Sequence, residues 1–185
     1  PDVSAPDLTS EMMDLFQDSG AEKNTTILLG AGASTTSGLP DWDELAMRLL
    51  VRSGSVKGVD AARLLVSRQD PLLVAEAACA ASGDHWRRHL RNALYAETGE
   101  LDPSPLHRAA VGHFLGGKPG ETQLVTLNFD TLLENALSAD SGNAVTPRVD
   151  GTRSGDGFDV HHLHGVVTPL EANEVVLTLT DFNTL

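Results

Sequence analysis

The chain of 185 residues is poor in cysteine, aromatic residues and positive charge. Cys79 is its single cysteine, which excludes an internal disulfide and every zinc site built from cysteine pairs. Only 13 Lys and Arg residues stand against 26 Asp and Glu, so the net charge is -13 and direct binding to nucleic acid or to an anionic membrane is disfavoured. No stretch approaches the roughly 20 apolar residues that span a bilayer. We therefore expect a soluble, cytoplasmic protein.

The remaining composition favours a compact domain that folds without disulfides or structural metal ions. The sequence is 41% hydrophobic, and its length suffices for a sizeable core. Ser10 precedes an apolar stretch and is a suitable N-cap, so we assign residues 1–23 to an N-terminal helical extension and residues 24–185 to the main domain. Between about residues 44 and 116, apolar residues at helical spacing predict a layer of short helices.

Short apolar runs on either side of this helical segment predict β-strands. Residues 25–29 and 123–127 are apolar and β-branched without polar alternation, which is typical of strands buried on both faces of a parallel sheet. Each run is followed by a turn and a helix, in the order of a nucleotide-binding unit. Further strands are expected near residues 144–147 and over 158–167 and 175–179.

The first candidate motif, Gly30-Ala31-Gly32-Ala33-Ser34, follows the first predicted strand directly. Its glycines allow positive φ and close approach to a pyrophosphate, and its backbone N–H groups offer an anion-binding nest. A tight turn that merely ends the strand explains the same residues. A second turn follows at residues 38–42, in which Asp41 is a possible helix cap.

Asn128 and Asp130 follow the second strand, at the sheet edge where open parallel α/β sheets bind ligands. Their amide and carboxylate are suited to hydrogen bonds with ribose hydroxyls or a carboxamide. Ordinary capping of the next helix is the alternative for both residues.

The third candidate is His161-His162-Leu163-His164-Gly165, at the end of another predicted strand. His164, followed by a small residue, is suited to act as a general base near neutral pH. A metal site on His162 and His164 is disfavoured because no third ligand is evident. His161 and His162 are expected to be polar residues of a half-exposed strand.

Together and in this order, these motifs resemble the NAD-site motifs of the sirtuin (silent information regulator) family. The motifs are Gly30 to Ser34, Gly38 to Trp42, Thr126 to Asp130, and His164-Gly165. Residues 103–107, 128–137 and 175–182 are more specifically similar to the sirtuin-like NAD hydrolases of prokaryotic antiviral defence. The similarity extends from about residue 25 to the end of the chain.

The resemblance implies a Rossmann-like parallel α/β sheet, of the sirtuin or DHS-like NAD-binding type, with an inserted helical layer. It also implies that NAD is the substrate, cleaved by water at its nicotinamide–ribose bond to give nicotinamide and ADP-ribose or a cyclised product. In this correspondence, Asn128 positions the ribose and the attacking water, and His164 is the base. The implied NAD-binding residues are Gly30, Ala31, Gly32, Ala33, Ser34, Asp41, Trp42, Thr126, Asp130 and Gly165, with no metal ligand.

Two departures from the sirtuin pattern shape the functional hypothesis. Protein-deacylating sirtuins carry a zinc module with two cysteine pairs, whereas this chain has Cys79 alone, so NAD-dependent deacylation is the least favoured activity. The family's later motif, which holds the adenosine ribose, has no counterpart before Leu185. We therefore expect that the C-terminal part of the domain is missing and that further segments mediate homo-oligomerisation or binding to a partner protein. A regulatory or assembly module that binds NAD or ADP-ribose without turnover is the main alternative to the hydrolase.

Overall fold

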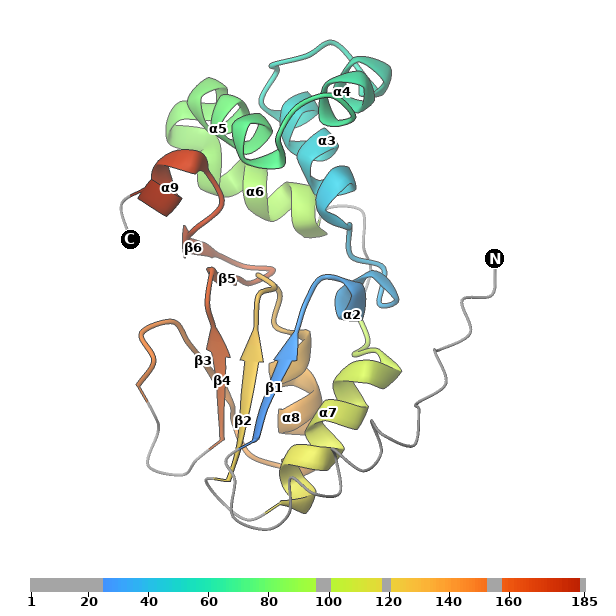
Figure 1. Cartoon of the computed structure of the whole chain (residues 1–185), viewed down its shortest axis with the longest axis vertical. Helices are drawn as coiled ribbons and strands as arrows, with labels where there is room; N and C mark the ends of the chain where they lie inside the picture. The colour runs from blue at the N-terminus through green and yellow to red at the C-terminus, as the bar shows by residue number, and fades with distance from the viewer. Residues whose placement is uncertain (1–24, 96–100, 118–120, 153–157, 184–185) are drawn as a thin grey trace, which may run out of the picture.

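The computed structural model describes residues 25–95, 101–117, 121–152 and 158–183 (Figure 1). The predicted extension over residues 1–23 lies outside this part of the chain. The described strands are β1 (Thr25–Leu29), β2 (Thr122–Thr126), β3 (Thr146–Arg148), β4 (Asp159–His162), β5 (Gly165–Val167) and β6 (Ala172–Val175). The described helices are α2 (Gly32–Thr35), α3 (Trp42–Arg52), α4 (Val59–Val66), α5 (Pro71–Ser82), α6 (Trp86–Tyr95), α7 (Pro105–Gly116), α8 (Leu132–Ser141) and α9 (Leu179–Asn183), with a 3-10 turn η1 (Gly83–His85).

Four parallel strands form the main sheet, in the order β1-β2-β4-β3. Leu29 pairs with Thr126 and Thr126 with His162, so β1, β2 and β4 end at the same edge. This arrangement confirms the prediction of an α/β, Rossmann-like fold. Because parallel strands end together, the loops that follow them meet above one edge of the sheet.

Helices α7 and α8 pack together on one face of the sheet (Figure 1). Leu124, Val160 and Leu137 are fully buried between this face and the helices. On the opposite face Leu28 is 55% exposed, so the prediction that the first strand is buried on both faces is wrong. Side chains alternate along a strand, and in β1 only the set facing the helices enters a core.

A second hydrophobic core lies in the helical layer of α3, α4, α5 and α6, which the chain inserts between β1 and β2 (Figure 1). Its fully buried side chains include Ala78 and Leu90. The helix at residues 105–116, predicted as part of this layer, instead packs as α7 against α8 and β2. The spacing of its apolar residues predicts a helix correctly, but the apolar surface on which this helix packs belongs to the sheet and not to the helical layer.

Two predicted strands differ from the structure. The stretch 158–167 forms β4 and β5, which belong to separate sheets and are divided at Leu163 and His164. The stretch predicted as a strand over 175–179 contains only the end of β6 at Val175 and the start of α9 at Leu179. The Asp181 side chain accepts hydrogen bonds from the Leu177 and Thr178 backbones, which turns the chain into a helix.

None of the helices in the described ranges is long and apolar enough to cross a membrane.

Candidate functional site

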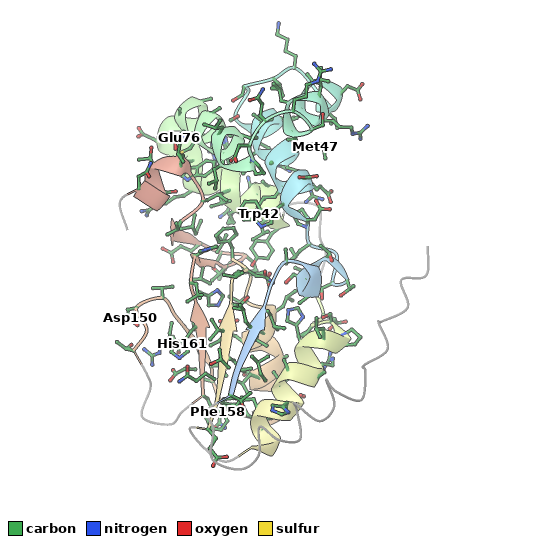
Figure 2. All side chains as sticks on the ribbon, in the orientation of Figure 1. Trp42, Met47, Glu76, Asp150, Phe158 and His161 are labelled. Carbon is green, nitrogen blue, oxygen red and sulfur yellow. The ribbon has the colours of Figure 1, made fainter. Side chains whose placement is uncertain are left out.

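The sequence motifs converge where the carboxyl ends of β1, β2 and β4 meet. The glycine motif follows β1, Asn128 and Asp130 follow β2, and His164 follows β4. The helical layer stands directly above this edge, and Figure 2 shows Trp42 of α3 between the layer and the strand ends. The sheet thus assembles motifs that are far apart in sequence.

The glycine motif forms a tight turn that leads into the single-turn helix α2. The Ala33 amide donates to the Gly30 carbonyl at 3.0 Å, and the Ser34 amide donates to Ala31 at 2.9 Å. Neither Gly30 nor Gly32 has a positive φ, so the left-handed conformation that we considered is not used here. A Cβ atom at either glycine would meet no atom within 4 Å. The turn therefore leaves open space beside its backbone, as close approach of a ligand requires.

Asn128 is fixed by hydrogen bonds on several sides. Its side-chain nitrogen Nδ2 donates to the Gly30 carbonyl at 3.0 Å and to Ser34 Oγ at 2.8 Å. Its backbone amide donates to Thr126 Oγ1 at 3.0 Å, and that hydroxyl donates to the Leu29 carbonyl. Because the Gly30 carbonyl only accepts, the amide nitrogen must face it. The side chain thus links the turns after β1 and β2.

Asp130 and Asn128 differ in what their side chains do. Asp130 Oδ1 accepts a hydrogen bond of 3.1 Å from the Leu132 amide. Asp130 thus binds the first amide of α8 from the position before the N-cap residue, Thr131. Asn128 makes no such bond, and its side chain points toward the glycine turn. Asp130 is only 5% exposed, yet it lines the pocket described next.

A pocket brings many of the predicted residues together between the strand ends and the helical layer. The predicted site residues that line it are Ala31, Ser34, Asp41, Trp42, Asn128 and Asp130. The apolar remainder is supplied by Leu39, Pro40, Leu45, Leu94, Leu127 and Phe129. Trp42 packs edge-on against Phe129, with ring centroids 6.0 Å apart. The result is a largely apolar pocket with a few polar groups, as is usual for small-molecule sites.

The loop before α3 is held in place by Asp41. Its carboxylate accepts a hydrogen bond of 2.8 Å from the Glu44 amide and caps the helix, as predicted. Because Asp41 also lines the pocket, it has both a structural role and a position next to any bound ligand.

His164 lies outside the residues that line the pocket and reaches the same region through Phe129. The two rings lie 6.5 Å apart between centroids. The next residue, Gly165, has a φ of 85°, which turns the chain from β4 into β5. Burial lowers the pKa of His164, so the imidazole is neutral at neutral pH and available as a base.

Comparison with protein families bears on the second half of the site. Residues 122–185 match the SIR2-like domain family. The predicted resemblance to sirtuins is confirmed over this stretch, which contains Asn128, Asp130 and His164. The glycine turn and Trp42 lie before the matched residues. Comparison with curated proteins gives no match.

Residues 122–185 also contain a buried pair, His162 and Glu134, whose role was not predicted from the sequence. His162, predicted to be a polar residue of a half-exposed strand, is 2% exposed, so that prediction is wrong. Its Nδ1 bonds the Asn128 carbonyl at 2.9 Å, and its Nε2 lies 2.6 Å from Glu134 Oε1. His162 is two residues after the fully buried Val160 and so shares its face, a periodicity that could have indicated burial. His161, also of β4, faces the other way and is partly exposed (Figure 2).

Among the residues that the structure describes, no group of three or more His, Cys, Asp or Glu side chains is placed to hold a metal ion. His162 is bonded to Glu134 and Asn128, and His164 lies beyond the end of β4.

Proposed function

We propose that this chain is a SIR2-like NAD hydrolase that cleaves the nicotinamide–ribose bond of NAD with water. The observation that carries the proposal is the hydrogen bonding of the Asn128 side chain, which lines the pocket. Gly30 and Ser34 occupy both hydrogens of its amide nitrogen, and no described residue donates to its oxygen Oδ1. An acceptor fixed in this way is suited to a ribose hydroxyl or a water molecule.

The proposed reaction needs little from the protein beyond positioning and a base. The bond between C1′ of the ribose and the ring nitrogen of nicotinamide breaks, and its electron pair neutralises the pyridinium. Water attacks C1′ through an oxocarbenium-like state and loses a proton to His164, which passes it to solvent. The products are nicotinamide, ADP-ribose and a proton. The neutral imidazole favoured by the burial of His164 fits this role.

The glycine turn is proposed to bind the pyrophosphate of NAD despite the net charge of -13. Open space lies beside Gly30 and Gly32, and backbone N–H groups in such turns create local positive potential. Ser34 and Asp130, both buried at the pocket, are proposed to line the nicotinamide end.

Hydrolysis is favoured over protein deacylation by the cysteine content. Cys79 is the single cysteine of the 185 residues, and it forms no disulfide. A zinc module with two cysteine pairs needs four cysteines, which this sequence does not supply. The similarity of residues 103–107, 128–137 and 175–182 to defence effectors supports a role in antiviral defence, with activity controlled by self-assembly or by a partner protein.

The proposal is tested by the release of nicotinamide from NAD by the purified protein. We expect Asn128→Ala and His164→Ala each to lower kcat by at least about 10²-fold, because one removes the positioning amide and the other the base. The measurement is chromatographic quantification of nicotinamide and ADP-ribose over time.

Asp159→Asn is the matched control for these variants. Asp159 lies in β4 and is buried to a similar extent as Asn128, and it pairs with Arg148 at 3.0 Å, away from the pocket. It should retain wild-type kcat. Binding of NAD by the wild type without release of nicotinamide, under every assembly state tried, would contradict the hydrolase and support a binding module.

A further inference from the structure

Directly behind Asn128 lies a buried ionisable pair that the proposed reaction does not use. His162 of β4 and Glu134 of α8 have side chains 0% and 5% exposed, and His162 Nε2 lies 2.6 Å from Glu134 Oε1. Ionisable groups are seldom buried so completely unless they are paired, because desolvation is costly. The place of the pair next to Asn128 indicates what it does.

The hydrogen-bond partners fix the position of one proton of the pair. The Asn128 carbonyl can only accept, so Nδ1 of His162 carries a hydrogen and donates to it at 2.9 Å. A second proton is then shared between Nε2 and Glu134 Oε1. Glu134 Oε2 is buried without a hydrogen-bond partner among the described residues, so the bond to His162 is its carboxyl's only support.

The charged surroundings favour protonation of the pair. Glu134 from α8 and Asp130 from the turn after β2 both place negative charge near His162, and Tyr95 of α6 faces the same two carboxylates. Burial alone would lower the pKa of His162, but the hydrogen bond and charge of Glu134 outweigh it and raise the pKa. Burial keeps the Tyr95 hydroxyl neutral by raising its pKa, so it adds no charge.

We propose that Glu134 and His162 are positioning residues that hold the Asn128 turn in its working geometry. The inference rests on the proposed function, because the geometry matters for NAD cleavage. Asn128 is held from both neighbouring strands: Gly30 and Ser34, after β1, bond its side chain, and His162 of β4 bonds its carbonyl. Glu134 orients the His162 ring through Nε2, much as outer carboxylates orient histidines at other sites.

The kinetic test compares Glu134→Ala and Glu134→Gln. Loss of the carboxyl leaves the His162 ring unsupported, and we expect kcat for NAD to fall by about 10- to 100-fold with a smaller change in KM. Glutamine preserves the shape and donates its amide hydrogen to Nε2, so it should restore most of the lost kcat. The control Asp159→Asn removes a charge from another ion pair of the sheet, in which only the carboxylate is buried, and should leave kcat unchanged.

A second readout does not depend on turnover. In nitrogen-15 NMR spectra, the wild type should show a hydrogen on Nδ1 of His162 and a slowly exchanging side-chain amide on Asn128. Glu134→Ala should shift the Asn128 amide signals and speed its exchange, and Glu134→Gln should lower the pKa of His162. If Glu134→Ala does not fold, the positioning role is tested in Glu134→Gln by the pKa of His162 and by the side-chain amide signals of Asn128.

Failure of this inference is distinguishable from failure of the proposed function. Folded Glu134→Ala with wild-type kcat and unchanged Asn128 signals would overturn the positioning role, as would an unmoved His162 titration in Glu134→Gln. If the wild type cleaves no NAD, the hydrolase proposal fails, and the NMR signals still decide whether the pair holds Asn128.

Discussion

At the scale of single residues, the site depends on which polar group each side chain contacts. Asn128 and Asp130 are two residues apart after the same strand, and the sequence offers the same two explanations for both. The structure separates them, because Asp130 accepts from the Leu132 amide at the start of the next helix, whereas Asn128 bonds residues 94 and 98 positions away. Contacts across such distances depend on strand order, which local sequence does not encode.

Ser34 and Ser37 provide a matched pair for testing the support of Asn128. Ser34 Oγ accepts from Asn128 Nδ2 at 2.8 Å, whereas Ser37 Oγ is buried without a hydrogen-bond partner among the described residues. We expect Ser34→Ala to lower kcat for NAD by about 5- to 10-fold, since a typical buried hydrogen bond contributes about 1 kcal/mol. Ser37→Ala should keep wild-type kcat and an equal or higher melting temperature. Equal kcat in both variants would contradict a role for Ser34.

The His162–Glu134 pair predicts a pH dependence of stability. The pKa of His162 is raised in the folded protein, where the bond and charge of Glu134 outweigh the opposing effect of burial. The folded state therefore binds this proton more tightly than the unfolded chain, whose histidine has a pKa of about 6.5. The resulting stabilisation is full below that pH and is lost as the pH rises through the raised pKa.

Urea unfolding of the wild type and Glu134→Gln checks this sign. The difference in unfolding free energy between the two should shrink as the pH is raised above about 6.5. The lowered pKa values of His107 and His164 contribute the opposite slope, but they do so equally in both proteins. A difference that grows with pH would contradict the assignment of the proton.

At the scale of elements, the local sequence pattern predicts some helices and strands correctly and fails for others. The first two strands and the cap of α3 follow from local pattern, and the structure has them where the sequence predicts them. The strand predicted over 175–179 is wrong because the Asp181 carboxylate bonds backbone amides that a strand would have used for pairing. The place of α7 could not be predicted either, since its apolar stripe fits a helical layer and a sheet equally well.

Asp41 allows the contribution of the α3 helix cap to stability to be tested. Asp41→Ala removes the hydrogen bond to the Glu44 amide and should destabilise the fold by about 1 kcal/mol. Asp41→Ser retains a capping oxygen and should recover most of that loss. Thermal unfolding of the two variants measures the effect, and equal melting temperatures for alanine and serine would show that the cap contributes nothing.

At the scale of the whole molecule, the site lies between two hydrophobic cores. One core joins α7 and α8 to the sheet, and the other joins the helical layer to the β5–β6 hairpin (Figure 1). Phe129 and Leu132, which follow β2, belong to the helical core, whereas Leu133 belongs to the sheet core. The segment carrying Asn128 therefore packs into both cores, so that the strand ends and the helical layer together form the pocket.

The order of motifs along the chain could be recognised from the sequence, and the family match over residues 122–185 confirms its second half. The buried His162–Glu134 pair could not be recognised from the sequence, because the two residues come from a strand and a helix and lie 28 positions apart. The orientation of β4 relative to α8 is what makes them neighbours.

The most direct test of the central claim is a product balance for NAD. Wild-type protein should convert NAD to equal amounts of nicotinamide and ADP-ribose, or of nicotinamide and a cyclised product, and Asn128→Ala should form neither. Both proteins should show the same secondary structure by circular dichroism. Equal rates in the two proteins, or a wild type that binds NAD and releases no nicotinamide, would contradict the proposal that this pocket hydrolyses NAD.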